Sequence, residues 1–298
     1  MSLAIPGDAA RERRIGYACA VAVLFVWVGF LLAARLSVKQ AMTPWDVAAL
    51  RYAGAFVGAV PLAMLLGWPR LPPRRAAAIV ATAAFGFPLF CYAGLVFAPT
   101  SHAGVMNAGM LPFLTAALGV AFLHEAWTRR RGLSLAVVLA GVVLLAFDTF
   151  GGHPGAWRGD LLLLSGSFSW AVYTTLVKRW GITALEATLT AALFAAPLYL
   201  PVWWLLLPSN LAAVPLGVAA FQFVYQGFFA VLLAGFLFTR AVTALGAPRT
   251  TTITALVPAI AALAAWPLLG EALGAAGLAG VALVSAGMIL GVAGRDVR

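Results

Sequence analysis

Charged residues are scarce in this sequence, and acidic residues are the scarcest among them. Only 9% of the 298 residues are charged and nine are acidic, whereas 63% are hydrophobic and the mean hydropathy is +1.00. A soluble domain is about half apolar and about a quarter charged, so this chain could not cover itself in water. The composition therefore excludes an ordinary soluble domain and indicates that the solvent is a lipid bilayer.

Cysteine is also scarce, and the signature motifs of several enzyme and pump classes are missing. The two cysteines, Cys19 and Cys91, lie inside apolar runs and predict neither a disulfide framework nor a metal site. No G-x-x-x-x-G-K-[ST] pattern is present, which argues against an ATP-driven pump. An intramembrane protease is the enzyme alternative, but no G-x-S-x-G pattern supports it. We therefore expect no enzyme activity, catalytic residue, metal site or cofactor.

Long apolar runs dominate what is present, and ten of them are long enough to cross a bilayer as helices. The predicted spans are 15–34, 45–66, 76–98, 102–123, 132–149, 160–177, 186–207, 217–238, 250–269 and 274–293. Runs of this length are too long for barrel strands, and a helix satisfies its own backbone groups in lipid. We therefore predict an all-α integral membrane protein with ten transmembrane helices.

The basic residues predict how these helices are oriented. When the ten spans alternate in direction, 15 of the 19 basic residues fall on one side, and only Arg35, Lys39 and Arg158 fall on the other. Short loops rich in Lys and Arg stay in the cytoplasm, so both termini are expected to be cytoplasmic. This topology also accounts for the net charge of +10, and no nucleic-acid partner is expected.

Two stretches of the chain resemble each other at a nearly constant offset. LPFLTAALGVAFLHEAW (111–127) aligns with VPAIAALAAWPLLGEAL (257–273), so that Glu125 corresponds to Glu271 at an offset of 146 residues. Earlier in each half, Trp27 corresponds to Trp170 at an offset of 143 residues, and the same offset brings Arg35 onto Lys178. The chain is thus predicted to consist of two homologous halves.

Each predicted half, 1–150 and 151–298, contains five spans and together they form one transmembrane domain. Because five is odd, the second half must enter the membrane upside down relative to the first. Inverted-topology repeats are typical of secondary transporters, whose halves rock around a central cavity near the midplane. The sequence therefore predicts a carrier of small molecules that works by alternating access.

The repeat, the Pro-x12-Glu helices and the aromatic segments FVWVGF (25–30) and FSWAVY (168–173) resemble the EamA-type transporters of the drug/metabolite transporter superfamily. Within that superfamily the chain resembles amino-acid exporters of the YddG type. The resemblance implies export of amino acids, with aromatic or large apolar side chains favoured, and of related metabolites across the bacterial inner membrane. Alternatives are a multidrug or nucleoside transporter of the same superfamily and, from another class, a channel. The expected partners are a small-molecule substrate and membrane lipid, with a monomer expected and a homodimer as the alternative.

A polar face within an apolar run is the first candidate for substrate binding. Gln222, Tyr225, Gln226 and Phe229 recur at the i, i+3, i+4, i+7 spacing of one helical face. An amide that faces lipid is costly, so this face is expected to point inward, towards a cavity. The alternative is that the glutamines bind neighbouring helices to each other through hydrogen bonds.

Aromatic residues deep in the spans are the second group of candidates. Trp170 and Tyr173 share a helical face, and Trp27 is the repeat partner of Trp170, so these rings could hold an aromatic or apolar side chain. Tyr92 of the third span could line the same space. Packing of large residues in the bundle is the alternative for all of them.

His102 and Asn107, at the start of the fourth span, are the remaining candidates. A structural or interfacial role is the alternative for the histidine. None of the nine acidic residues lies well inside a span, which favours weak or absent proton coupling unless His102 serves it.

Arg51 is the single basic residue placed well inside a span, so a phosphate-bearing substrate is not expected. We expect its side chain to snorkel outward, with Asp46 as a possible neighbour, rather than to meet a substrate carboxylate.

Overall fold

The computed structural model describes residues 6–124, 127–152, 154–245, 250, 253–254 and 256–292, and these residues form helices joined by short turns. The first half contains α1 (Pro6–Lys39), α2 (Pro44–Leu66), α3 (Pro73–Ile79), η1 (Val80–Gly86), α4 (Phe87–Phe97), α5 (Thr100–Ala103), η2 (Gly104–Gly109), α6 (Leu111–Leu123) and α7 (Arg129–Gly152). The second half contains α8 (Trp157–Trp180), α9 (Ala184–Leu206), η3 (Leu211–Ala213), α10 (Leu216–Gln222), η4 (Phe223–Leu233), α11 (Ala234–Leu245), α13 (Val257–Leu269) and α14 (Ala275–Val292).

Six helices of the described chain are long and apolar enough to cross a membrane. They cover Ala10–Lys39, Pro44–Leu66, Pro73–Phe97, Trp157–Trp180, Ala184–Leu206 and Leu216–Leu245. Many large apolar side chains on them point outward, such as Leu65, which is 81% exposed. A water-soluble monomer rarely exposes apolar surface on this scale, so the all-helical, multi-pass membrane protein predicted from the sequence is confirmed. The count of ten spans stays a prediction.

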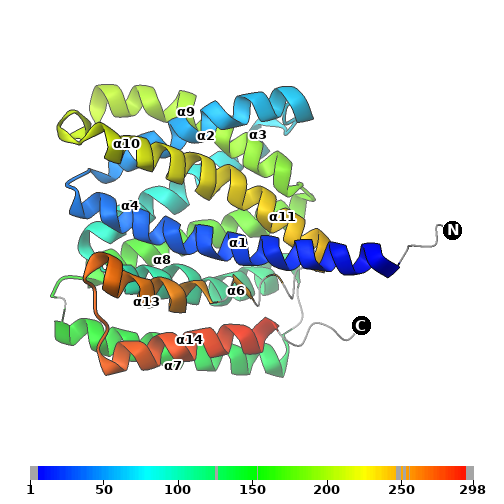
Figure 1. Cartoon of the computed structure of the whole chain (residues 1–298). Coiled ribbons are helices and arrows are strands. Elements are labelled where there is room, and N and C mark those ends of the chain that lie inside the picture. The colour runs from blue at the N-terminus through cyan, green and yellow to red at the C-terminus, as the bar shows by residue number, and fades with distance from the viewer. Residues whose placement is uncertain are drawn as a thin grey trace.

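The helices lie side by side in a bundle (Figure 1). α7 packs along α14 at one edge, and α9 packs on α2 at the opposite edge. Between these edges, α4 packs on α8, and α1 packs on α11. The described ends of the chain, at Pro6 and Val292, lie at the same end of the bundle (Figure 1). We name this end the Pro6 end and the opposite one, where α1 stops, the Lys39 end.

Two helices of the bundle begin with the same local signal. Thr43 caps α2 by accepting a hydrogen bond from the backbone N–H of Asp46, and Thr183 caps α9 by accepting one from Glu186. A hydroxyl at this position satisfies a backbone donor that the helix itself cannot pair. Each cap therefore defines where its span begins.

α2 and η4 approach each other at two glycines. A Cβ added to Gly54 would overlap the carbonyl oxygen of Phe223, and one added to Gly227 would lie 2.6 Å from the backbone nitrogen of Ala55. Small residues let membrane helices pack backbone to backbone. This contact holds the polar side chains of η4 against α1 and α2 in the interior.

Within the described residues, η1, η2 and η4 are wound as π-helix. Their i→i+5 hydrogen bonds are rare in proteins and occur frequently at functional sites. The predicted polar face assumed α-helical winding from Gln222 to Phe229, but the structure changes to π-helix at Phe223. Asn107, in η2, and Gln226, in η4, are both on such segments.

Candidate functional site

The two glutamines of the predicted polar face are completely buried, at 0% exposure. Their amide nitrogens and the hydroxyl of Tyr225 donate hydrogen bonds to backbone carbonyls along one face of α1. The pairs are Gln222 Nε2 to Ala33 O at 2.8 Å, Tyr225 Oη to Val26 O at 3.4 Å, and Gln226 Nε2 to Phe30 O at 3.5 Å. The face thus points inward, and its donors form the helix-to-helix bonds that the sequence left as an alternative. Contact with a substrate stays a prediction.

A buried polar cluster surrounds Gln226. The hydroxyl of Tyr92, from α4, donates to Gln226 Oε1 at 3.0 Å, and Arg51 Nη1, from α2, donates to the backbone carbonyl of Gln226 at 3.2 Å. The guanidinium also lies 5.4 Å from the ring centre of Phe30. Arg51 is only 8% exposed, so the prediction that it snorkels outward is wrong. Close packing of α2 on η4 keeps the guanidinium inside the bundle.

Asp46, the expected neighbour of Arg51, interacts with other groups. Its carboxylate accepts hydrogen bonds from Trp203 Nε1 at 3.0 Å, Ser209 Oγ at 2.5 Å and the backbone nitrogen of Asn210 at 3.1 Å. These bonds join the start of α2 to the end of α9 at the Lys39 end. Asp46 therefore stabilises the connection between two helices, and its carboxylate does not form an ion pair with Arg51.

Asn107 and Gln222 each bury an acceptor oxygen that has no hydrogen-bond partner in the described part of the chain. Asn107 Nδ2 contacts Cys91 Sγ at 3.1 Å, while its Oδ1 has no donor. Most buried polar atoms in proteins are hydrogen-bonded, so two free acceptors near the buried cluster are candidate positions for a ligand's donors. Asn107 thus stays a predicted substrate-binding residue.

The two tryptophans of the predicted clamp each pack against a neighbouring helix. Trp27 lies 5.4 Å from Phe238 of α11, and Trp170 lies 4.9 Å from Phe87 of α4 and 4.8 Å from Tyr173, measured between ring centres. No ring contact between described residues joins Trp27 to Trp170 directly. In this conformation the structure does not bring the two tryptophans together.

His102 is buried beside an acidic residue of another helix. Its Nδ1 lies 2.9 Å from Asp160 Oδ1, which belongs to the first turn of α8. The expectation that the acidic residues lie at span ends holds for Asp160, yet folding brings it to a histidine that is 2% exposed. The pair joins α5 to α8 at the Lys39 end.

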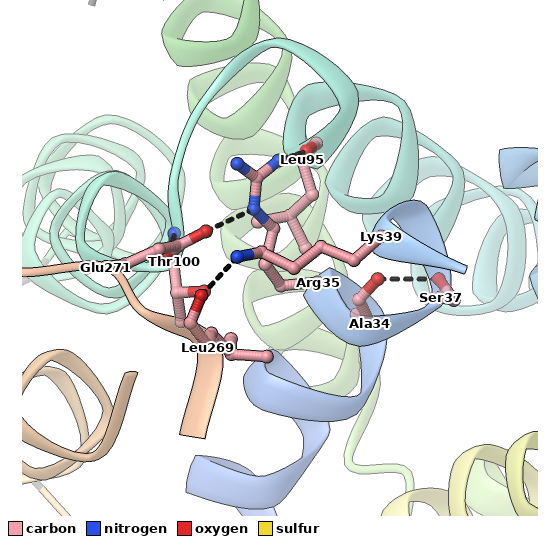
Figure 2. Close-up of polar contacts among 8 residues, drawn as sticks. All are labelled: Ala34, Arg35, Ser37, Lys39, Leu95, Thr100, Leu269 and Glu271. Carbon is pink, nitrogen blue, oxygen red and sulfur yellow. Dashed lines mark hydrogen bonds and ion pairs between the residues drawn. The ribbon is translucent and has the colours of Figure 1, made fainter. Parts of the chain in front are cut away.

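An ion pair connects distant parts of the sequence at the same end (Figure 2). Arg35 Nε, near the end of α1, lies 2.6 Å from Glu271 Oε1, which follows α13. The second oxygen of Glu271 accepts the backbone N–H of Thr100 at 2.9 Å, and Lys39 donates to the carbonyl of Leu269 (Figure 2). Both side chains of the ion pair are largely buried, at 18% and 13% exposure.

The electrostatics of Glu271 favour its charged form. Burial alone raises the pKa of this carboxyl, but hydrogen bonds from Arg35 and Thr100, together with the charge of Arg35, outweigh burial and leave the pKa below its ordinary value. Sequence reasoning marked Arg35 and Glu271 through the repeat but did not pair them, because they lie 236 positions apart. Glu125, the repeat counterpart of Glu271, lies outside the described residues.

The Pro6 end has an ion pair of a different kind. Arg240 Nη2 lies 2.6 Å from Glu12 Oε2, but the side chains are 28% and 52% exposed. Exposed pairs contribute little because water screens them. Among the described residues, the more deeply buried ion pairs therefore lie at the Lys39 end.

A helical bundle with exposed apolar sides and a buried polar centre is an architecture that membrane transporters have. Comparison with known families supports this class, because the EamA-like transporter family matches residues 14–147 and again residues 157–292. The chain therefore belongs to the EamA-like transporter family, within the drug/metabolite transporter superfamily, and carries two copies of the EamA repeat.

Two curated relatives and a solved structure are similar to this chain. A "Probable amino-acid metabolite efflux pump" of Salmonella typhimurium is 24% identical over 298 residues, covering 96% of this chain and 97% of that protein. "Uncharacterized transporter YyaM" of Bacillus subtilis is 26% identical over 183 residues, covering 59% of each chain. A crystal structure whose description names no function has a TM-score of 0.65 at 20% identity, covering 94% of this chain and 96% of that one. The last likeness concerns the fold alone.

Proposed function

We propose that this protein exports amino acids and related small metabolites across the bacterial inner membrane by alternating access, favouring aromatic or large apolar side chains. Five helices from residues 1–150 and five from 151–298 form an inverted repeat around the substrate path. Both termini lie in the cytoplasm, so the Lys39 end faces the periplasm. The carrier acts as a monomer, with a homodimer as the alternative.

The helix contacts support the inverted repeat, because they occur in equivalent pairs. α4 packs on α8, and α11 packs on α1. These two contacts are equivalent under the repeat, which relates the third predicted span (α4) to the eighth (α11) and the sixth (α8) to the first (α1). Likewise, α6 packs on α8 and α13 packs on α1. α7 with α14 and α2 with α9 are the self-equivalent pairs. The matching caps at Thr43 and Thr183 add local support.

The observation that carries the transport mechanism is the largely buried contact between the two halves at the Lys39 end. At the Lys39 end, Arg35, Glu271 and Thr100 join the two halves through largely buried contacts. The ion pair described at the Pro6 end is exposed. Alternating access requires one end to be closed while the other can open. We infer that this conformation is closed at the Lys39 end and that transport requires the Arg35–Glu271 contact to break.

The proposed substrate class is based on the buried polar cluster and on the name of the Salmonella relative, a probable amino-acid metabolite efflux pump. The predicted substrate-binding residues are Trp27, Tyr92, His102, Asn107, Trp170, Tyr173, Gln222, Tyr225 and Gln226. Aromatic rings would contact an apolar side chain, and stacking contributes about 0.5–1.5 kcal/mol per good pair beyond area burial. The buried amides and hydroxyls would meet the polar end of the substrate.

Counterflow in proteoliposomes tests this function. Vesicles loaded with an unlabelled amino acid should accelerate the uptake of the same labelled amino acid, and aromatic amino acids should give the strongest response. A channel would show uptake without this trans-stimulation. Stimulation by nucleosides or cationic drugs, with none by any amino acid, would favour the alternative substrates of the same superfamily.

A further inference from the structure

Arg51 is a buried cation without a counter-charge. Its guanidinium donates a hydrogen bond to the carbonyl of Gln226, lies over the ring of Phe30 and interacts with the hydroxyl of Tyr92, and all three partners are uncharged. No ion pair between described residues includes it. Asp46, the acidic residue nearest in sequence, is already bound to Trp203, Ser209 and Asn210. The guanidinium therefore has unused N–H donors at 8% exposure.

A buried guanidinium without a counter-charge is energetically unfavourable unless a ligand supplies the negative charge. Charged groups inside membrane proteins are paired in most cases, and an unpaired one marks a functional site by default. A guanidinium stays protonated in proteins, so Arg51 cannot relieve the cost by losing its charge. The same site contains no second Lys or Arg among the residues that hydrogen-bond to Gln226. The site around Arg51 therefore provides one positive charge, which matches a ligand with one negative charge.

We propose that Arg51 binds the carboxylate of the transported substrate. A guanidinium presents two parallel N–H donors, a geometry that matches the two oxygens of a carboxylate. The buried hydroxyl of Tyr92, beside the same Gln226, lies next to this position. The proposal rests on the function proposed above, because it assigns one residue of the substrate site of the same carrier.

The position of Arg51 fits a site that the Lys39 end controls. α2 begins at Pro44, so Arg51 lies about 10 Å along the helix from that end at 1.5 Å per residue. The Arg35–Glu271 pair closes the same end of the bundle. A carboxylate that enters or leaves on this side would therefore meet Arg51 about two helical turns below the start of α2. Glu271 already neutralises Arg35. The residue proposed to bind the substrate carboxylate is therefore different from the charged residues that close this end.

A first experiment uses the parent protein without any substitution. In counterflow, L-phenylalanine is compared with L-phenylalaninamide and phenethylamine, which keep the ring and the amine but lack the carboxylate. We expect apparent affinity to fall at least ~10-fold for both analogues, equivalent to about 1.4 kcal/mol. Equal transport of all three compounds would overturn the assignment while leaving the carrier function intact. If no amino acid gives counterflow, the proposed function fails together with the assignment.

A second experiment tests whether Arg51 causes the preference for substrates that have a carboxylate. Arg51→Gln should remove the ~10-fold difference between phenylalanine and its amide, and Arg51→Lys should reduce it because the ammonium lacks the planar fork. Arg158→Gln is the matched control, since Arg158 also lies over an aromatic ring, that of Trp157, but is exposed. The control should keep the parent's preference.

The charge-conserving variant keeps the test decisive if Arg51→Gln does not fold. Arg51→Lys, checked for monodispersity and thermal stability, should weaken phenylalanine more than phenylalaninamide. An equal loss for both compounds would show that Arg51 only holds helices together, which overturns the proposal. Retention of the full carboxylate preference in a folded Arg51→Gln variant would also overturn it.

Discussion

Glu271→Gln should open the Lys39 end of the transporter. The substitution keeps the shape of the side chain but removes the charge that binds Arg35 at 2.6 Å. A hydrogen bond to a charged group contributes about 1.5–3 kcal/mol when it is largely buried. Loss of this contribution should shift the equilibrium towards the state open at that end by about 10- to 150-fold. The shift follows from the proposed mechanism, in which the contact is made only while the two halves are closed there.

Cys91 is a native reporter for this opening. It is fully buried beside Asn107 in the present conformation, so a water-soluble thiol reagent should reach it only when the path opens. In a Cys19→Ala background, the initial rate of Cys91 labelling should rise in Glu271→Gln by the same factor as the open population. The reagent should be membrane-impermeant and added from the side of the Lys39 end.

Glu12→Gln is the matched control for this measurement. It removes the acidic partner of Arg240 from the exposed ion pair at the Pro6 end. Labelling from the Lys39 side should stay at the parent's rate in this variant. Equal labelling rates in the parent and Glu271→Gln would refute the view that the Arg35–Glu271 contact closes the path.

Further predictions concern pH, specificity and topology. The pKa of Glu271 lies below its ordinary value, so its contribution to closure should be complete at neutral pH and disappear as the pH falls through that lowered pKa; spin-label distances across the Lys39 end should lengthen only in acid. Trp170→Ala should weaken transport of large side chains more than small ones, whereas Gln226→Leu should weaken all amino acids, since a lost buried hydrogen bond costs about 1–3 kcal/mol; initial rates in folded variants measure both. Reporters fused after residue 298 and within 150–158 should fall on opposite sides of the membrane, and signals from the same side would contradict the inverted repeat.

The sequence alone determined much of the fold, through the lipid solvent that its composition requires and the length of its apolar runs. In lipid, an apolar run of about 20 residues has to be a helix, because no water is available for its backbone groups. The all-helical class therefore followed from composition and from the length of the apolar runs, and the family followed from a resemblance carried by the repeat, the Pro-x12-Glu helices and the aromatic segments. Gln222 and Gln226 were also expected to face inward, since exposure of an amide to lipid is unfavourable.

Tertiary structure decided how the polar side chains are paired. Arg51 points inward rather than to the membrane surface because α2 and η4 meet at two glycines, which no helical periodicity reveals. Arg35 and Glu271 meet across 236 positions, and His102 meets Asp160 across 58, because helices from separate parts of the chain end at the same side of the bundle. A hydropathy pattern reports which residues avoid lipid. The partner of each buried charge depends on which helices pack together, and that arrangement exists only in the folded bundle.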